Sequence, residues 1–213
     1  MPKRTFFNLP DEKRQKIIDV AIEEFAANGY AGTSINSIVS RLDIAKGSIY
    51  QYFDNKKDFY LYLVKFVKES YMEHRAEFVG NLEKQPVMDI LHKTMLSFRD
   101  FRENFPIRVS FYFTMVGDTS IPFVEEISRI MTEPSLKYMR GIIDSAIKRG
   151  ELREDIDIDM LVFDLVMLIT AFQQATVNPV MARYYNIDTK SKKSVSAAAE
   201  RLLDIVFKGI GKR

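Results

Sequence analysis

The sequence has no cysteine and only two histidines among its 213 residues. The lack of cysteine excludes thiol catalysis, disulfide bonds and cysteine-ligated zinc sites. His74 and His92 do not form a His-x-x-x-His pair that could ligate a metal, and the chain has neither a glycine-rich phosphate loop nor a Gly-x-Ser-x-Gly nucleophile motif. We therefore expect a protein that is not an enzyme and that holds neither a metal nor a cofactor.

Neither sign of charge predominates, and long hydrophobic runs are missing. The chain has 31 Lys and Arg residues against 29 Asp and Glu residues, so any nucleic-acid contact must depend on locally placed charges. The most apolar segment, Met160 to Phe172, includes Asp164 and is shorter than the roughly 20 residues that span a bilayer. Lys3 and Arg4 precede no signal-peptide stretch; they form either a DNA-contacting arm or, more simply, a disordered end. These features predict a cytoplasmic protein without a membrane partner.

Apolar residues recur at helical spacing in nearly every segment, and no stretch alternates as a half-buried strand does. The pattern predicts an all-α fold with Thr33 and Asn55 as helix N-caps. Pro134 is expected to kink or split the long helical stretch that contains it. The expected helices cover 11–28, 33–42, 46–53, 56–79 and 157–177, with a long stretch that ends at Gly150 and a last helix that ends near 208.

The first three helices, with a short turn at 43–45, predict a helix-turn-helix whose third helix enters a DNA groove. Ile49 and Phe53 are expected to face inward. The outer face of the third helix carries a lysine, a glycine, and hydroxyl and amide groups that can contact phosphates or base edges. The residues expected there are Lys46, Gly47, Ser48, Tyr50, Gln51 and Tyr52.

The run from Ile17 to Phe59 resembles the DNA-binding region of the tetracycline-repressor (TetR) family of transcriptional regulators. The resemblance rests on Glu-Glu-Phe-Ala-Ala-Asn-Gly-Tyr at 23–30, Lys-Gly-Ser-Ile-Tyr at 46–50, Tyr-Phe at 52–53 and Asn-Lys at 55–56. It implies an all-α homodimeric repressor with a helix-turn-helix DNA-binding domain over 1–55 and a larger helical ligand-binding and dimerisation domain over 56–213.

The resemblance also implies roles for single residues at the positions that match the family's motif. Thr33, Tyr50, Tyr52 and Lys56 occupy positions that usually touch the DNA backbone, whereas contacts at Lys46, Ser48 and Gln51 vary with the operator.

Two residues depart from the family's pattern. Asp43 stands where the turn usually has a glycine, and Ala45 stands where a capping serine is common. We therefore expect a recognition helix that is slightly less well capped.

Six aromatic residues fall between positions 98 and 113, and such a concentration of flat side chains can line a cavity for an apolar or aromatic ligand. Ordinary core packing is the alternative explanation. If a cavity is present, we expect its filling to shift the helix over 56–79 and to change the distance between two recognition helices. The predicted ligand-binding residues are Tyr62, Phe66, Phe98, Phe101, Phe105, Phe111, Tyr112 and Met115.

The segment from 157 to 177 is apolar almost all round, which is more than one face can bury inside a single subunit. Together with the last helix and the family resemblance, this predicts a two-fold interface between two copies of the chain, with burial in the monomer core as the alternative. The predicted interface residues are Phe163, Met167, Ala198, Leu202 and Val206.

These predictions combine into one function. We expect a ligand-responsive DNA-binding transcriptional regulator, a repressor that binds a palindromic operator as a homodimer and is released by a small apolar or aromatic effector. The alternative is a helical small-molecule-binding protein that does not bind an operator.

Overall fold

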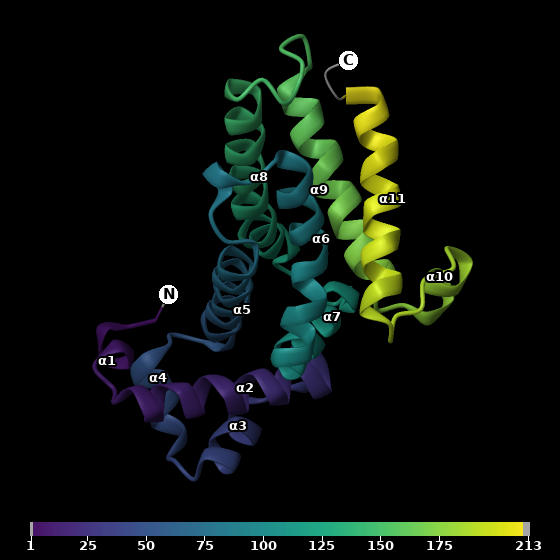
Figure 1. The fold of residues 1–213 in the computed structure, drawn as a ribbon. Helices are drawn as coiled ribbons and strands as arrows, with labels where there is room; N and C mark the ends of the chain where they lie inside the picture. Colours follow the sequence, from purple (N-terminus) through teal and green to yellow (C-terminus); the bar gives the residue numbers. More distant parts are fainter. Residues whose placement is uncertain (1, 211–213) are drawn as a thin grey trace. The chain divides into compact units, whose positions relative to one another are not determined.

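The structure, a computed structural model, describes residues 2–210, and within that range it contains only helices and their connections (Figure 1). The predicted all-α fold is confirmed. The chain divides into two compact units, each built from segments that are distant in the sequence. The predicted domain boundary between residues 55 and 56 remains a prediction, because the two units are defined by packing within the chain and do not test where one functional domain ends. Unit 1 comprises Met1–Ser70 and Arg102–Met131, and unit 2 comprises Tyr71–Phe101 and Thr132–Arg213.

Unit 1 has a core made by the apolar faces of its short helices. Phe25, Ile38 and Ile49 come from three successive helices and are all buried, as their helical spacing predicts. Phe111, from a later helix, completes the same core. The helices of this unit are α1 (Arg4–Phe7), α2 (Asp11–Gly32), α3 (Ile35–Leu42), α4 (Lys46–Tyr52), the first part of α5 (Lys56–Val79) and α7 (Pro106–Gly117).

The helix ends in unit 1 follow their capping chemistry, with one correction. Asn55 caps α5, because its Oδ1 atom accepts a hydrogen bond from the Asp58 amide at 2.9 Å. The prediction that Thr33 caps α3 is wrong. The cap is Ser34, whose hydroxyl accepts a hydrogen bond from the Ser37 amide at 3.0 Å, while the Thr33 side chain is buried.

Unit 2 packs its longer helices around a second apolar core, which includes Leu91, Ile143 and Leu203. Pro134 does not split α8, which runs through it as one helix. Gly150 follows that helix with φ 72°, a left-handed conformation that suits a glycine after a helix end. The helices of this unit are η1 (Leu82–Lys84), most of α6 (Val87–Asn104), most of α8 (Val124–Lys148), α9 (Ile158–Ala175), α10 (Pro179–Tyr184) and α11 (Lys192–Ile210).

Two short helices, α1 and α10, were not expected from the sequence. Both are too short to be stable alone, so only their packing holds them. The α9 helix is long and apolar enough to cross a membrane by length and composition. That is weak support for a membrane span, because the core helix of a soluble protein passes the same test.

Candidate nucleic-acid interface

The helix-turn-helix of unit 1 is formed by α3, a tight turn and α4. Asp43 ends α3 in the left-handed conformation, with φ 54° and ψ 47°. This is the position where the resembled family usually has a glycine. Aspartate reaches this conformation at a cost that glycine avoids. Ala45 then precedes α4 and offers no side-chain cap. The expected weakness in the capping of the recognition helix is therefore present in the structure.

The α4 helix separates its buried and exposed faces as predicted, except at one residue. Ile49 is buried, while Lys46, Tyr50 and Gln51 are exposed; the Tyr50 side chain is 42% accessible. A methyl group at Gly47 would meet nothing within 4 Å, so the backbone there is open to a close approach. This face presents a cation, a hydroxyl and an amide together, which suits contacts to phosphates and base edges.

The outer-face position predicted for Tyr52 is wrong. Tyr52 is only 7% exposed, and its ring lies 5.8 Å from the ring of Phe6 in α1. The sequence pattern missed this because α1, the element that covers Tyr52, was not expected. The contact of Tyr52 with DNA stays a prediction.

Three other predicted DNA contacts differ in their surroundings. The Thr33 hydroxyl donates to the Gly29 carbonyl oxygen at 2.8 Å, so it already has a structural partner. The Lys56 ammonium lies 4.4 Å from the centre of the Tyr30 ring, and burial lowers its pKa. Ser48 is half-buried near the start of α4. Their contacts with DNA also stay predictions.

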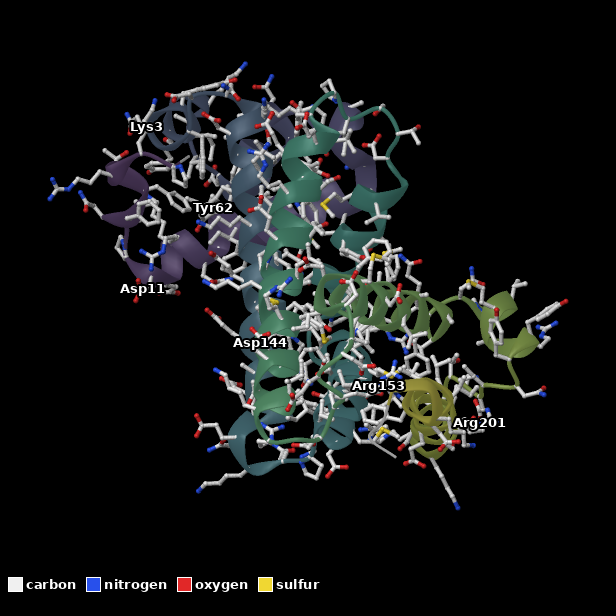
Figure 2. The ribbon with its side chains drawn as sticks, turned by 90° about the horizontal axis from the view of Figure 1, so that it is seen from above. Lys3, Asp11, Tyr62, Asp144, Arg153 and Arg201 are labelled. Atoms are coloured by element: carbon white, nitrogen blue, oxygen red, sulfur yellow. The ribbon has the colours of Figure 1, made fainter. Side chains whose placement is uncertain are left out.

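The N-terminal segment lies against the C-terminal end of α4 and is not the disordered end that was the simpler expectation from the sequence. The Lys3 ammonium donates to the Tyr50 carbonyl oxygen at 2.9 Å and pairs with Asp54 at 2.8 Å. The Thr5 hydroxyl donates to the Gln51 carbonyl oxygen at 2.6 Å. Since the last carbonyls of a helix lack partners within the helix, these contacts cap the recognition helix. Lys3 and Tyr62 mark this end of unit 1 in Figure 2.

A tether in unit 1 joins α7 and the residue that follows it, Asp118, to the C-terminal part of α2. At Gly29, with φ 67°, α2 is interrupted, and the Asp118 carboxylate accepts a hydrogen bond from the next amide, that of Tyr30, at 3.0 Å. The Thr114 hydroxyl donates to the Ala26 carbonyl oxygen at 2.8 Å. Hydrogen bonds from the Ser120 side chain, and then from backbone amides, lower the pKa of Asp118. The α2 interruption is thus held by the ionised side chain of Asp118, which directly follows α7.

The predicted ligand-binding residues divide between the two units. Phe98 and Phe101 lie in unit 2, where their rings are 5.7 and 5.4 Å from the Tyr71 ring. The other six belong to unit 1, where Phe111 and Met115 are buried in the core. For those two residues, the structure has the core packing that was the alternative explanation. Ligand contacts stay a prediction for the set Tyr62, Phe66, Phe98, Phe101, Phe105, Phe111, Tyr112 and Met115.

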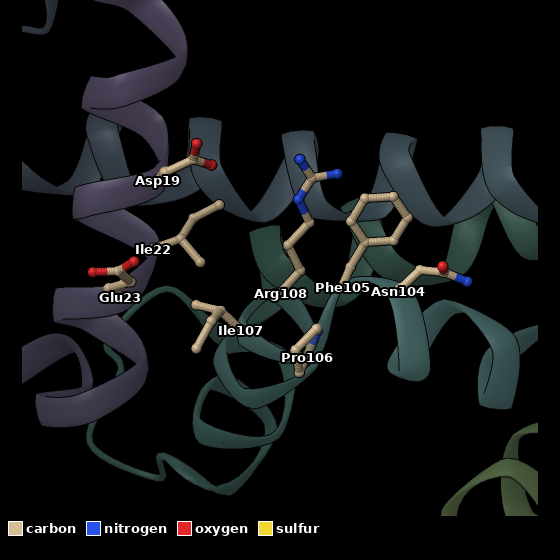
Figure 3. Close-up of a pocket in the computed structure, with 8 residues that line it drawn as sticks. All are labelled: Asp19, Ile22, Glu23, Asn104, Phe105, Pro106, Ile107 and Arg108. Atoms are coloured by element: carbon tan, nitrogen blue, oxygen red, sulfur yellow. The ribbon is translucent and has the colours of Figure 1, made fainter.

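One pocket of unit 1, of about 270 Å³, is lined by Phe105 (Figure 3). Asp19 and Glu23 project from α2 on one side, and Arg108 lies beside the Phe105 ring, with its guanidinium carbon 4.6 Å from the ring centre. The same carbon is 5.0 Å from the centre of the Phe66 ring. This pocket combines aromatic surface with both signs of charge.

The predicted dimer residues fall into two groups. Phe163 and Met167 on α9 are 51% and 53% exposed, which suits an interface. Ala198 is buried within the core of unit 2, and Leu202 and Val206 are partly buried against that core. For Ala198 the structure therefore shows the alternative, burial in the monomer.

Sequence reasoning missed several residues of structural importance. Lys3 and Thr5 were missed because their partners are backbone carbonyls of α4, which carry no sequence signal. Arg75 was missed because a lone arginine on a long helix reads as a solvated charge, yet it is only 4% exposed. Within the described range, 2–210, no group of three or more His, Asp or Glu side chains is placed to hold a metal ion.

Comparisons with known proteins agree with this geometry. The family model described as "Bacterial regulatory proteins, tetR family" matches residues 17–63. The HTH-type transcriptional regulator YezE of Bacillus subtilis (strain 168) is 30% identical over 154 residues, which cover 68% of this chain and 76% of YezE. The fatty acid metabolism regulator protein of the same strain is 26% identical over 159 residues, covering 68% of this chain and 74% of that protein.

Solved structures have the same fold. A TetR family transcriptional regulator from Chloroflexus aurantiacus J-10-FL aligns with a TM-score of 0.64 and 30% identity over 100% of both chains. The regulator FadR from Bacillus subtilis, solved with stearoyl-CoA, has a TM-score of 0.70 at 22% identity and covers 92% of this chain and 98% of its own. A complex of SmeT with triclosan has a TM-score of 0.71 at 19% identity and covers 95% and 93%.

Proposed function

The chain belongs to the TetR family of bacterial transcriptional regulators, and on that premise we propose that it binds a palindromic operator as a homodimer and is released by a small-molecule effector. The predicted family membership is confirmed, as are a ligand-responsive DNA-binding regulator and a protein that is not an enzyme. DNA and small molecules are the partner classes of this family. The operator, the effector and the direction of regulation are the parts that we propose.

The observation that carries the operator proposal is the exposed face of α4. Lys46, Tyr50 and Gln51 stand on it, while Ile49 fixes the helix in the core of unit 1. A short helix held by one buried face can enter the major groove with its other face. We propose that Lys46 and Tyr50 contact phosphates and that Gln51 reads a base edge.

The dimer proposal rests on the exposed apolar side chains of α9. Met160, Phe163 and Met167 are spaced along one side of this helix, and each is more than half exposed. Ile205 on the neighbouring helix α11 is 68% exposed. Apolar surface of this kind favours association, and a two-fold pair of subunits would read two half-sites about one DNA turn apart.

The dimer has a direct test by light scattering. A charge placed at the centre of the apolar stripe, as in Phe163→Glu, is expected to convert the dimer into a monomer at micromolar protein concentration. Val116→Glu is the matched control, because Val116 is equally exposed, at 54%, but lies on α7 in unit 1. Equal masses for the two variants would contradict the proposed interface.

For the effector we propose a small molecule with an apolar or aromatic body, and for the protein a cytoplasmic location. Support for the effector comes from the aromatic side chains among the predicted ligand-binding residues and from the ligands of two structural neighbours: stearoyl-CoA carries a long apolar acyl chain, and triclosan is aromatic. Support for the location comes from DNA binding itself, which requires access to the chromosome.

The experiment that tests the operator proposal is selection of random duplex DNA by the purified protein at near-physiological salt. An enriched inverted repeat is the expected result. With that duplex, Tyr50→Phe is expected to weaken binding to all sequences, and Gln51→Ala to change the preference at one base pair by about 1–3 kcal/mol. Lys46→Ala is expected to reduce the salt slope of binding by about 1.

Lys137→Ala is the matched charge control, because Lys137 is an exposed lysine on α8 in unit 2. It should leave the affinity and the salt slope unchanged. If the folded dimer enriches no sequence, the operator proposal is wrong. The alternative function, a helical small-molecule-binding protein, would then be favoured.

A further inference from the structure

Unit 2 contains a buried cation, Arg75, that forms no ion pair with any residue from 2 to 210. Arg75 lies on α5 and is only 4% exposed. Its guanidinium carbon is 3.8 Å from the centre of the Tyr138 ring and 5.4 Å from that of Tyr71. Tyr71 and Arg75 are one helical turn apart and therefore share a face of α5. The arginine is thus held between aromatic rings in the interior of the unit.

No carboxylate in the described part of the chain forms an ion pair with Arg75. Its Nε atom is buried without a hydrogen-bond partner, and its Nη2 atom contacts the Met72 sulfur at 2.6 Å. A guanidinium stays protonated in a protein, and a thioether is a weak acceptor. Aromatic faces offset part of the cost of burying the charge, but an unpaired buried charge remains strongly unfavourable. The surroundings of Arg75 therefore suit the approach of an anion.

Arg99, which is also buried among the described residues of unit 2, is held differently. Arg99 is 8% exposed, and its Nη2 atom donates to the Lys190 carbonyl oxygen at 3.1 Å. The fold therefore supplies an oxygen acceptor to Arg99. For Arg75 it supplies a flexible methionine side chain, which an incoming oxygen could displace easily.

The side chain of Tyr138, whose ring lies next to Arg75, also carries a buried hydroxyl group. The Tyr138 Oη atom is buried near Thr94 and meets no partner with full hydrogen-bond geometry among residues 2–210. Burial raises the pKa of Tyr138, so its hydroxyl remains protonated and can donate a hydrogen bond. A guanidinium fork and a phenol together form a donor set that suits an oxyanion.

The surroundings of Tyr71 are fixed by polar and aromatic contacts. Its hydroxyl accepts a hydrogen bond from the Gln173 amide at 2.8 Å and lies 3.1 Å from the Ser97 hydroxyl. The rings of Phe98 and Phe101 pack on its ring. A molecule whose charged end meets Arg75 would therefore find aromatic surface next to it.

We propose that Arg75 and Tyr138 bind the anionic group of the effector, so that the effector is a carboxylate or phosphate carried by an apolar body. The proposal rests on the proposed function, because it specifies the effector of the same regulator. The anion replaces the Met72 sulfur at the guanidinium, and the Tyr138 hydroxyl donates to it. A carboxylate and a phosphate can both accept hydrogen bonds from Arg75 and Tyr138, so the experiment compares these two groups.

The test uses the full-length protein and its thermal unfolding, with laurate, dodecyl phosphate and naphthoate as the anionic probes. Dodecanol and naphthyl methanol are the matched neutral probes. At least one anionic probe is expected to raise the melting temperature, and its neutral counterpart to do so far less. A larger shift with laurate than with dodecyl phosphate would identify a carboxylate site, and the reverse a phosphate site.

Two variants separate binding from folding. Arg75→Met is expected to weaken binding of the anion at least tenfold and so to abolish the rise in melting temperature that the anion causes. Without ligand, the melting temperature of this variant should be unchanged or higher, because the substitution removes an unpaired buried charge. Tyr138→Phe, which removes one hydroxyl, should weaken binding by a smaller factor. Lys137→Met, a surface charge change on α8, is the control and should behave as the parent protein does.

Three outcomes would overturn the site: no stabilisation by any anionic probe, equal stabilisation by the neutral counterparts, or a lower melting temperature of Arg75→Met without ligand, which is the mark of a structural arginine. Operator release is measured separately with the selected duplex. If the anion binds through Arg75 but does not release the operator, the proposed function fails and the site stands. If a neutral molecule releases the operator from Arg75→Met as well as from the parent, the site fails and the function stands.

Discussion

The N-terminal helix α1 provides a sharp test of how the recognition helix is held. Phe6 is completely buried, and its ring lies 4.9 Å from the Phe53 ring and 5.2 Å from the Tyr62 ring. Burial of a phenylalanine contributes about 1.5–3 kcal/mol, and aromatic pairs add about 0.5–1.5 kcal/mol. Phe6→Ala should therefore lower the free energy of unfolding of unit 1 by about 3 kcal/mol.

Loss of α1 also removes the donors to the last carbonyls of α4. Lys3 and Thr5 reach the Tyr50 and Gln51 carbonyl oxygens only when α1 is docked. The variant should therefore bind a selected operator more weakly, by about tenfold, which corresponds to about 1.4 kcal/mol.

The assay is thermal or urea unfolding followed by circular dichroism, in parallel with operator titration. At about 2–4 °C per kcal/mol for a chain of this length, Phe6→Ala should lower the melting temperature by about 6–12 °C. Phe7→Ala is the matched control, because Phe7 lies on the same helix but is 54% exposed, and its substitution should stay within about 0.5 kcal/mol. Equal effects of the two substitutions would refute the docking of α1.

Three further predictions concern caps and tethers. Asp118→Asn should destabilise the protein by about 1 kcal/mol at neutral pH. Because the folded pKa of Asp118 lies below its usual value, the stability that the carboxylate contributes is present above about pH 4 and is lost as the pH falls through the folded pKa. A difference in stability from the parent protein that persists below both pKa values would contradict the tether. Glu151→Ala should lower the free energy of unfolding by about 1–2 kcal/mol, because the Glu151 carboxylate accepts a hydrogen bond from the Val87 amide at 2.5 Å and so caps α6. The control is Glu154→Ala, a substitution of an exposed neighbour, which should show almost no change in urea unfolding. At the recognition motif, Ser34→Ala should cost about 1 kcal/mol and Ala45→Ser should stabilise by a similar amount, and opposite shifts of the melting temperature would check both caps.

Local sequence rules were enough to define the helices that carry function. The buried stripe of Ile38, Val39 and Leu42 in α3, the cap at Asn55 and the interruption at Gly29 all depend on neighbours within a few positions along the chain. For the same reason, the helix-turn-helix could be recognised and the exposure of Tyr50 and Gln51 predicted. The sequence alone thus determined the class of the fold, the DNA-reading motif and the family.

Tertiary packing decided what each exposed-looking residue does. Tyr52 lies inside because α1 folds back onto α4. The aromatic residues between 98 and 113 divide between the two units because the chain passes from one unit to the other within them. Arg75 is buried without an ion-pair partner among the described residues because helices from distant parts of unit 2 close around it. Helical periodicity states which residues share a face, but only the packing of distant segments determines what covers that face.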